Sequence, residues 1–162
     1  MLVVSDTSPL SNLAIIDRLE LLRAQFGHIV IPLAVRLELD RLSHPEARAR
    51  LEAAFQEGWV HVSPLASAVP PDLVSTLDPG EAEALALAQQ LKASLVLLDE
   101  SAARLQATQL GIPHAGVLGV LCRGKQSGQV SSLATEIRRL RSEARFFVSP
   151  ALEKRLLAAA GE

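Results

Sequence analysis

Two aspartates stand at the ends of uncharged aliphatic runs, where acidic side chains could do chemistry. Asp6 follows the run at residues 2–5, and Asp99 follows a second run at residues 95–98. Such runs are typical of strands buried on both faces at the centre of a parallel sheet. Ligands of open α/β sheets gather at the carboxyl ends of these strands. If the two strands are neighbours, their carboxylates meet at one edge of the sheet and form a candidate metal site.

Structural interpretations compete with this one at each acid. Pro9 predicts a helix start just after Asp6, and aspartate is a good N-cap, so Asp6 taken alone is better explained as a cap. The second copy of the pattern at Asp99 favours function. Glu38 lies between leucines in a predicted helix, where it is explained as a surface charge that pairs with Arg36 or Arg41.

A further helix is predicted to start sharply at the sequence Asp78-Pro79-Gly80-Glu81. Asp78 as cap, Pro79 at the first helical position and Glu81 at the third have the pattern of a capping box. Glu81 and Glu83 both lie near the helix N-terminus, where the helix dipole favours anions. Residues two apart point in different directions, so at most one of the two glutamates faces a site.

Composition limits the class of protein. With 162 residues, 49% hydrophobic and 21% charged, the chain suits one globular domain. Aromatic residues make up 3%, which argues against base stacking as the main binding device, and the net charge of −2 argues against a generic cationic nucleic-acid binder. The single Cys122 excludes an internal disulfide. Because no apolar run has the length of a membrane span and no signal-peptide pattern opens the chain, we expect a cytoplasmic protein.

Helical and strand patterns alternate along the chain. Helices are expected at residues 9–25, 33–42, 47–56, 79–91, 101–110, 116–125 and 151–160, with residues 63–75 as a loop. Four or five short strands separate these helices, which predicts an α/β fold with a parallel sheet. A basic run at residues 138–145 is typical of a solvated helix face, and binding of nucleic acid or a partner is the alternative.

Five segments in order, VVSDTSPL, IPLAVRLEL, LDPGEAEALALA, LVLLDE and GIPHAGVLGVL, resemble the PIN domain, a family named from the N-terminal region of PilT proteins. The GEAEA and GVLGVL segments are similar to a prokaryotic PIN-like subgroup related to toxin ribonucleases. The resemblance runs over a core at residues 1–128, and the C-terminal helices at 129–162 match more loosely. It implies a single domain over residues 1–162 with a three-layer α/β/α sandwich and a central, mostly parallel sheet.

PIN domains are metal-dependent ribonucleases whose site holds three or four acids. By this resemblance the site acids and metal ligands fall on Asp6, Glu38, Glu81 and Asp99. Glu83 competes with Glu81 for the third place, and Ser8 matches an auxiliary hydroxyl that orients a carboxylate. The chain departs from the family pattern with a glutamate where aspartate is usual, and with Leu97 where many members have Thr or Ser. These departures bear on catalytic competence more than on the fold.

The chemistry of such a site follows from its oxygen ligands. Carboxylates suit Mg²⁺ or Mn²⁺, and one or two of these ions would supply the activated water for hydrolysis of an RNA phosphodiester. The implied partners are an RNA substrate, a second copy in a homodimer and, if the chain is the toxin of a toxin–antitoxin pair, an antitoxin protein.

Two other functions stay open at this point. A PIN-like fold that binds RNA or protein without cutting would show no metal-dependent cleavage. A haloacid-dehalogenase-like phosphohydrolase also uses an aspartate after its first strand. That family usually has a second aspartate two positions later, where this chain has Ser8.

Overall fold

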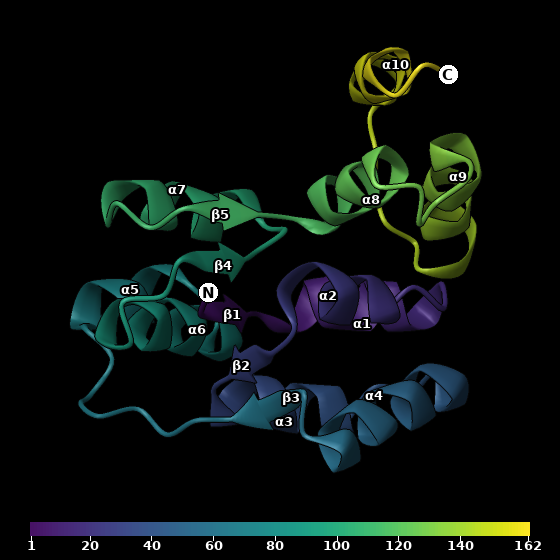
Figure 1. The fold of residues 1–162 in the computed structure, drawn as a ribbon. Coiled ribbons are helices and arrows are strands. Elements are labelled where there is room, and N and C mark those ends of the chain that lie inside the picture. Colours follow the sequence, from purple (N-terminus) through teal and green to yellow (C-terminus); the bar gives the residue numbers. More distant parts are fainter.

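The computed structural model describes residues 1–162 as five strands and ten helices (Figure 1). The strands are β1 Val3–Ser5, β2 Ile29–Ile31, β3 Val60–Val62, β4 Leu95–Leu97 and β5 His114–Ala115. The helices are α1 Thr7–Ile15, α2 Glu20–Phe26, α3 Leu33–Asp40, α4 Pro45–Glu57, α5 Pro71–Thr76, α6 Pro79–Gln90, α7 Ser101–Gln109, α8 Val117–Gln126, α9 Leu133–Glu143 and α10 Pro150–Ala159. None of them combines the length and the apolar composition needed to cross a membrane.

All five strands are parallel, in the order β3-β2-β1-β4-β5. The chain moves outward from β1 through β2 and β3, and then returns to the other side of β1 for β4 and β5. The direction therefore reverses between β1 and β4, and in open α/β sheets a ligand crevice lies at such a switch point. β1 pairs with β4 in a register that sets Ser5 opposite Leu97, so the two strands end level with each other.

Both faces of the sheet are buried under helices. Successive strand residues point to opposite faces. Val3 and Ile29 belong to the larger core, which packs against α1, α2, α4 and α8, whereas Val4 and Val96 belong to a second core against α5, α6 and α7. Figure 1 shows these two groups of helices on either side of the strands. The result is the expected α/β/α sandwich with a parallel sheet.

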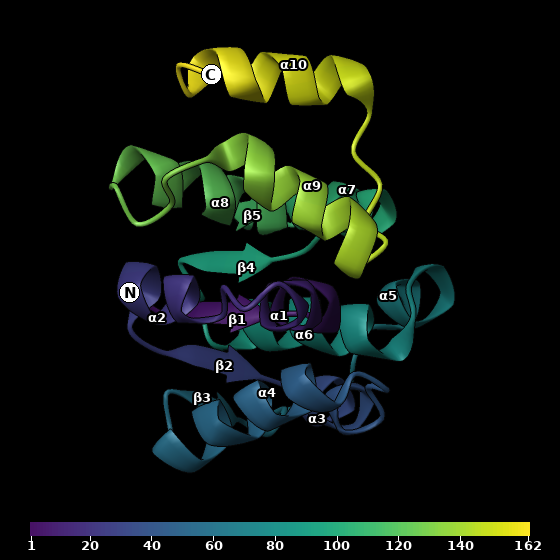
Figure 2. The same ribbon diagram turned by 90° about the vertical axis from the view of Figure 1, so that its right-hand side faces the viewer.

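The C-terminal helices extend the larger face beyond β5. In Figure 2, α10 lies at one end of the molecule, outside α8 and α9, and α3 and α4 lie at the other end. No residue of α10 is fully buried, although Leu152 and Leu156 pack against the larger core. The segment between α9 and α10 places the partly buried Phe146 against the same core.

The structure corrects two of the expected elements. The single helix expected at residues 9–25 is broken at Asp17, which has a φ of 57°. The Arg18 N–H donates to the Leu13 carbonyl over 2.7 Å, a pattern that ends a helix after a left-handed residue. The loop expected at residues 63–75 overlaps α5, which begins at Pro71.

The basic run near the C-terminus is held largely within the chain. Arg139 forms ion pairs with Glu136 and Glu143, at 3.7 and 2.9 Å. Arg141 pairs with Glu153 of α10. These contacts tie α9 to itself and to α10, which supports the structural interpretation of these arginines.

Candidate active site

Asp6 lies at the carboxyl end of the central strand, beside the switch point. Its N–H donates to the Leu97 carbonyl over 3.0 Å, which continues the β1–β4 ladder to the start of α1. The residue is only 4% exposed, and its side chain makes no capping hydrogen bond to α1. Asp6 thus occupies the N-cap position of α1 as expected, but its side chain does not cap the helix. Its Oδ1 is buried with no hydrogen-bond partner.

Asp99 follows β4 and faces the same switch point. Its Oδ1 accepts a hydrogen bond from the Val117 N–H at the start of α8, over 2.8 Å, and its Oδ2 accepts from the Ser8 hydroxyl over 3.0 Å. Asn12 Nδ2 in turn donates to the Ser8 oxygen over 3.0 Å. A Cβ at Gly116 would lie 2.6 Å from Asp99 Oδ1, so only glycine allows α8 to begin this close. Ser8 thus orients a carboxylate, although it is that of Asp99.

Glu38 reaches the site from α3. Its Oε2 accepts a hydrogen bond from the hydroxyl of Thr7, the residue next to Asp6. On its other side, a Cβ at Gly80 would lie 2.6 Å from Glu38 Oε1. Glu38 therefore lies between the end of β1 and the start of α6, and its interpretation as a surface charge paired with Arg36 or Arg41 is wrong.

Glu81 is held in place by the capping box that begins α6. Its N–H donates to Asp78 Oδ1 over 2.9 Å, and its Oε1 accepts from the Asp78 N–H over 3.3 Å. The remaining oxygen, Oε2, is buried without a partner. Glu83 points elsewhere, since its Oε1 accepts from the Ala34 N–H in the first turn of α3 over 3.3 Å. Of the two glutamates, Glu81 is the one that lies among the acids.

Burial and neighbouring negative charges raise the pKa values of two acids in this site, Asp6 and Glu81, to about 7. Burial raises the pKa of Asp6 from 3.8 to about 7, and the negative charges of Asp78, Glu81 and Glu38 add to the effect. Burial and the neighbouring Asp78 also raise the pKa of Glu81, from 4.5 to about 7. Burial raises the pKa of Asp99 as well, opposed by its hydrogen bonds from Val117 and Ser8. Such shifts toward neutrality are common at functional sites.

The donor set matches a hard divalent cation, although the side chains do not converge on one point. No three of the chain's His, Cys, Asp and Glu side chains stand in an arrangement that could hold a metal ion. The partnerless buried oxygens of Asp6 and Glu81 are the observation that favours a cation, because a buried carboxylate oxygen without a partner is costly. Carboxylate oxygens are the ligands that Mg²⁺ and Mn²⁺ prefer.

Sequence reasoning missed three residues of this site. Asp78 was predicted only as a cap, yet its charge acts on both Asp6 and Glu81. Thr7 holds Glu38 and carried no signal, since a threonine at a helix start is ordinary. Asn12 is 8% exposed and follows Ser8 by four residues on α1. That spacing places two side chains on one helix face and was the available signal.

The fold and the acids at its switch point define an α/β protein with a buried carboxylate site. The family described as DUF3368, PIN domain, matches residues 2–162, and the chain belongs to this family. PIN domains are typically nucleases, which makes this chain a hydrolase in the coarse sense. The haloacid-dehalogenase-like alternative finds no support.

A solved structure with the same fold is a PilT N-terminus domain protein from the hyperthermophilic archaeon Sulfolobus solfataricus P2. The two are 20% identical, with a TM-score of 0.54, and the match covers 76% of this chain and 92% of the other. At this identity the likeness shows the fold alone, and it confirms the PIN-like architecture. No curated protein matches the chain.

Proposed function

We propose that this chain is a metal-dependent ribonuclease that hydrolyses RNA phosphodiesters. The observation that carries the proposal is the gathering of Asp6, Glu38, Glu81 and Asp99 at the switch point between β1 and β4. Two of their buried oxygens lack any partner in the protein.

These four acids are the residues that would hold Mg²⁺ or Mn²⁺, and binding would require their side chains to converge more closely than they do here. When bound, one or two such ions supply an activated water and stabilise the charge that develops on the phosphate. The chain's own groups prepare the site: Ser8 and the Val117 N–H fix the Asp99 carboxylate, and Thr7 fixes that of Glu38. Burial behind these contacts strengthens the attraction of the acids for a cation.

The test is cleavage of a mixed-sequence panel of single-stranded RNAs with Mn²⁺, with Mg²⁺ and with EDTA. Asp6→Asn and Glu81→Gln should each abolish cleavage and leave the circular dichroism spectrum unchanged. Glu83→Gln is the matched control, because it alters a glutamate two residues further on the same helix that binds the α3 backbone instead.

Retained cleavage in Asp6→Asn would refute the assignment of the site. If the wild-type protein binds RNA but never cleaves it with either ion, the non-cutting binding module replaces the nuclease.

A protein partner is the second part of the proposal. Leu33 and Leu37, one turn apart on α3, are 57% and 46% exposed, which is consistent with a protein contact beside the site. By family analogy the partner is a second copy or, if the chain is the toxin of a toxin–antitoxin pair, an antitoxin. Light scattering after size-exclusion chromatography tests the dimer, and a monomer at all concentrations would contradict it.

A further inference from the structure

A hollow of about 370 Å³ opens directly beside Asp99. Its walls come from four parts of the chain: Arg104 of α7, His114 of β5, the first turn of α8, and the C-terminal segment with Phe146, Leu152 and Leu156. The volume lies at the lower end of that of ordinary small-ligand sites, which is the scale of one building block of a polymer.

One wall of the hollow is cationic, and its arginine is oriented by a short relay. The Thr108 hydroxyl donates to the Arg104 carbonyl over 3.1 Å and therefore accepts from His114 Nε2, at 3.1 Å. That leaves His114 Nδ1 as the acceptor for Arg104 Nε, at 3.4 Å. Both terminal amines of the guanidinium stay free, since Arg104 forms no ion pair. A guanidinium with two free amines matches the two oxygens of a phosphate group.

The facing wall is apolar and carries a flat ring. Phe146 is half-buried against the core, and its N–H donates to the Leu140 carbonyl over 3.0 Å, which anchors the segment that carries it. Leu152 and Leu156, one turn apart on α10, complete this wall. The chain has only four Phe and one Trp, so the single ring of Phe146 can stack on one base and not on several successive bases. Unstacked RNA bases bind to aromatic rings of this kind.

We propose that this hollow binds the nucleotide next to the scissile phosphate, with Arg104 on a phosphate and Phe146 stacked on the base. The proposal rests on the RNA cleavage proposed above and names where the substrate lies relative to Asp99. The positive charge of Arg104 also offsets the repulsion between the RNA phosphates and the negatively charged acids.

The experiment measures binding of a fluorescein-labelled, single-stranded RNA 12-mer by anisotropy in EDTA, so that cleavage does not interfere. Arg104→Gln should weaken binding about tenfold and reduce the slope of log affinity against log salt by about one. Phe146→Leu keeps an apolar side chain on the core and removes the flat ring. It should weaken binding about five- to tenfold and leave the salt slope unchanged.

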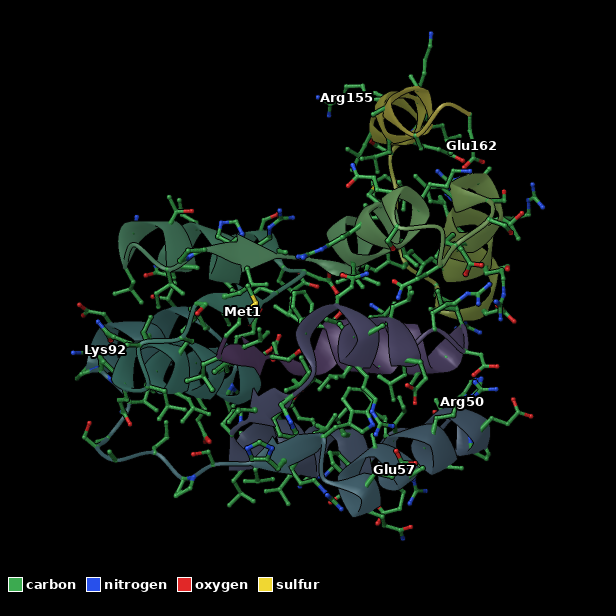
Figure 3. The ribbon with its side chains drawn as sticks, in the orientation of Figure 1. Met1, Arg50, Glu57, Lys92, Arg155 and Glu162 are labelled. Atoms are coloured by element: carbon green, nitrogen blue, oxygen red, sulfur yellow. The ribbon has the colours of Figure 1, made fainter.

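Arg48→Gln is the matched control, because Arg48 is an exposed arginine of α4 without an ion pair. In Figure 3, Arg50 and Glu57 mark α4, and Arg155 marks α10, which lines the hollow. The two helices lie at opposite ends of the molecule. Binding by this variant should equal that of the wild type, and melting temperatures should show that all three variants fold.

The outcomes separate the two proposals. If Arg104→Gln binds like Arg48→Gln with an unchanged salt slope, the subsite is overturned, while Mn²⁺-dependent cleavage that is lost in Asp6→Asn still supports the nuclease. If the wild type binds RNA but does not cleave it, the nuclease falls and the anisotropy still decides the role of Arg104. A wild-type chain that does not bind RNA overturns the subsite, and if it also cleaves no RNA with either ion, the nuclease is overturned as well.

Discussion

Asp6 should make the metal-free protein less stable as the pH rises. Its pKa is about 7 in the folded chain and close to its ordinary value of 3.8 when unfolded. The folded state thus holds a proton that the unfolded state has lost, and stability falls with pH until the folded carboxyl has ionised. Each pKa unit corresponds to about 1.4 kcal/mol, so Asp6 alone should cost roughly 3 kcal/mol of unfolding free energy between about pH 5 and about pH 8.

The measurement is urea unfolding in EDTA across this pH range, for the wild type and for Asp6→Asn. The asparagine cannot ionise, so the variant should lack this loss and be more stable than the wild type at about pH 8, by about 2–4 kcal/mol. Asp72→Asn is the control, since Asp72 is an exposed aspartate of α5, and its curve should follow that of the wild type. Parallel curves for the wild type and Asp6→Asn would refute the argument that burial and neighbouring acids raise this pKa.

Three further outcomes are expected. Gly80→Ala should lower Mn²⁺ affinity by about tenfold in calorimetric titration, because the added Cβ meets Glu38 Oε1 at 2.6 Å. Gly119→Ala is its control, since a Cβ there would meet its nearest atom at an ordinary contact distance of 3.7 Å. Equal Mn²⁺ affinities for the two variants would contradict the reasoning. Ser8→Ala removes a hydrogen bond that lowers the pKa of Asp99, so half-maximal Mn²⁺ binding should move up by about half to one pH unit; an unchanged profile would show that the hydroxyl does not act on this carboxyl. Mg²⁺ at about 100 times its Kd should raise the melting temperature by about 5–10 °C at neutral pH and EDTA should reverse it, whereas no shift with either ion would count against a metal site.

The parts of the fold set by local pattern could be predicted from the sequence. Asp6 and Asp99 follow apolar runs, and the parallel pairing of β1 with β4 brings such strand ends together. The choice between Glu81 and Glu83 was also within reach, because a capping box turns its third helical residue back toward the cap. The helix break at Asp17 was not, since aspartate rarely takes the left-handed conformation that glycine takes easily.

Long-range contacts explain what the sequence could not predict. Arg104 and Phe146 line one hollow although 42 positions separate them by subtraction, and neither residue carries a local sign of the other. The role of Glu38 likewise depends on Thr7, in another helix, and on the close passage of α6. Such positions are fixed by packing between elements and not by any spacing along the chain.

The two close-approach glycines limit how this protein can be engineered. Alanine at a helical glycine is ordinarily a safe stabilising choice, worth about 0.5–1 kcal/mol, and α6 contains Gly80. Gly116 has extended backbone angles that any residue adopts, so backbone conformation alone gives no reason to keep a glycine there. Both are nevertheless required because a carboxylate oxygen occupies the space of the missing Cβ. A redesign that replaced Gly80 by alanine on helix propensity alone would place the new Cβ against Glu38 Oε1 and displace a carboxylate of the site.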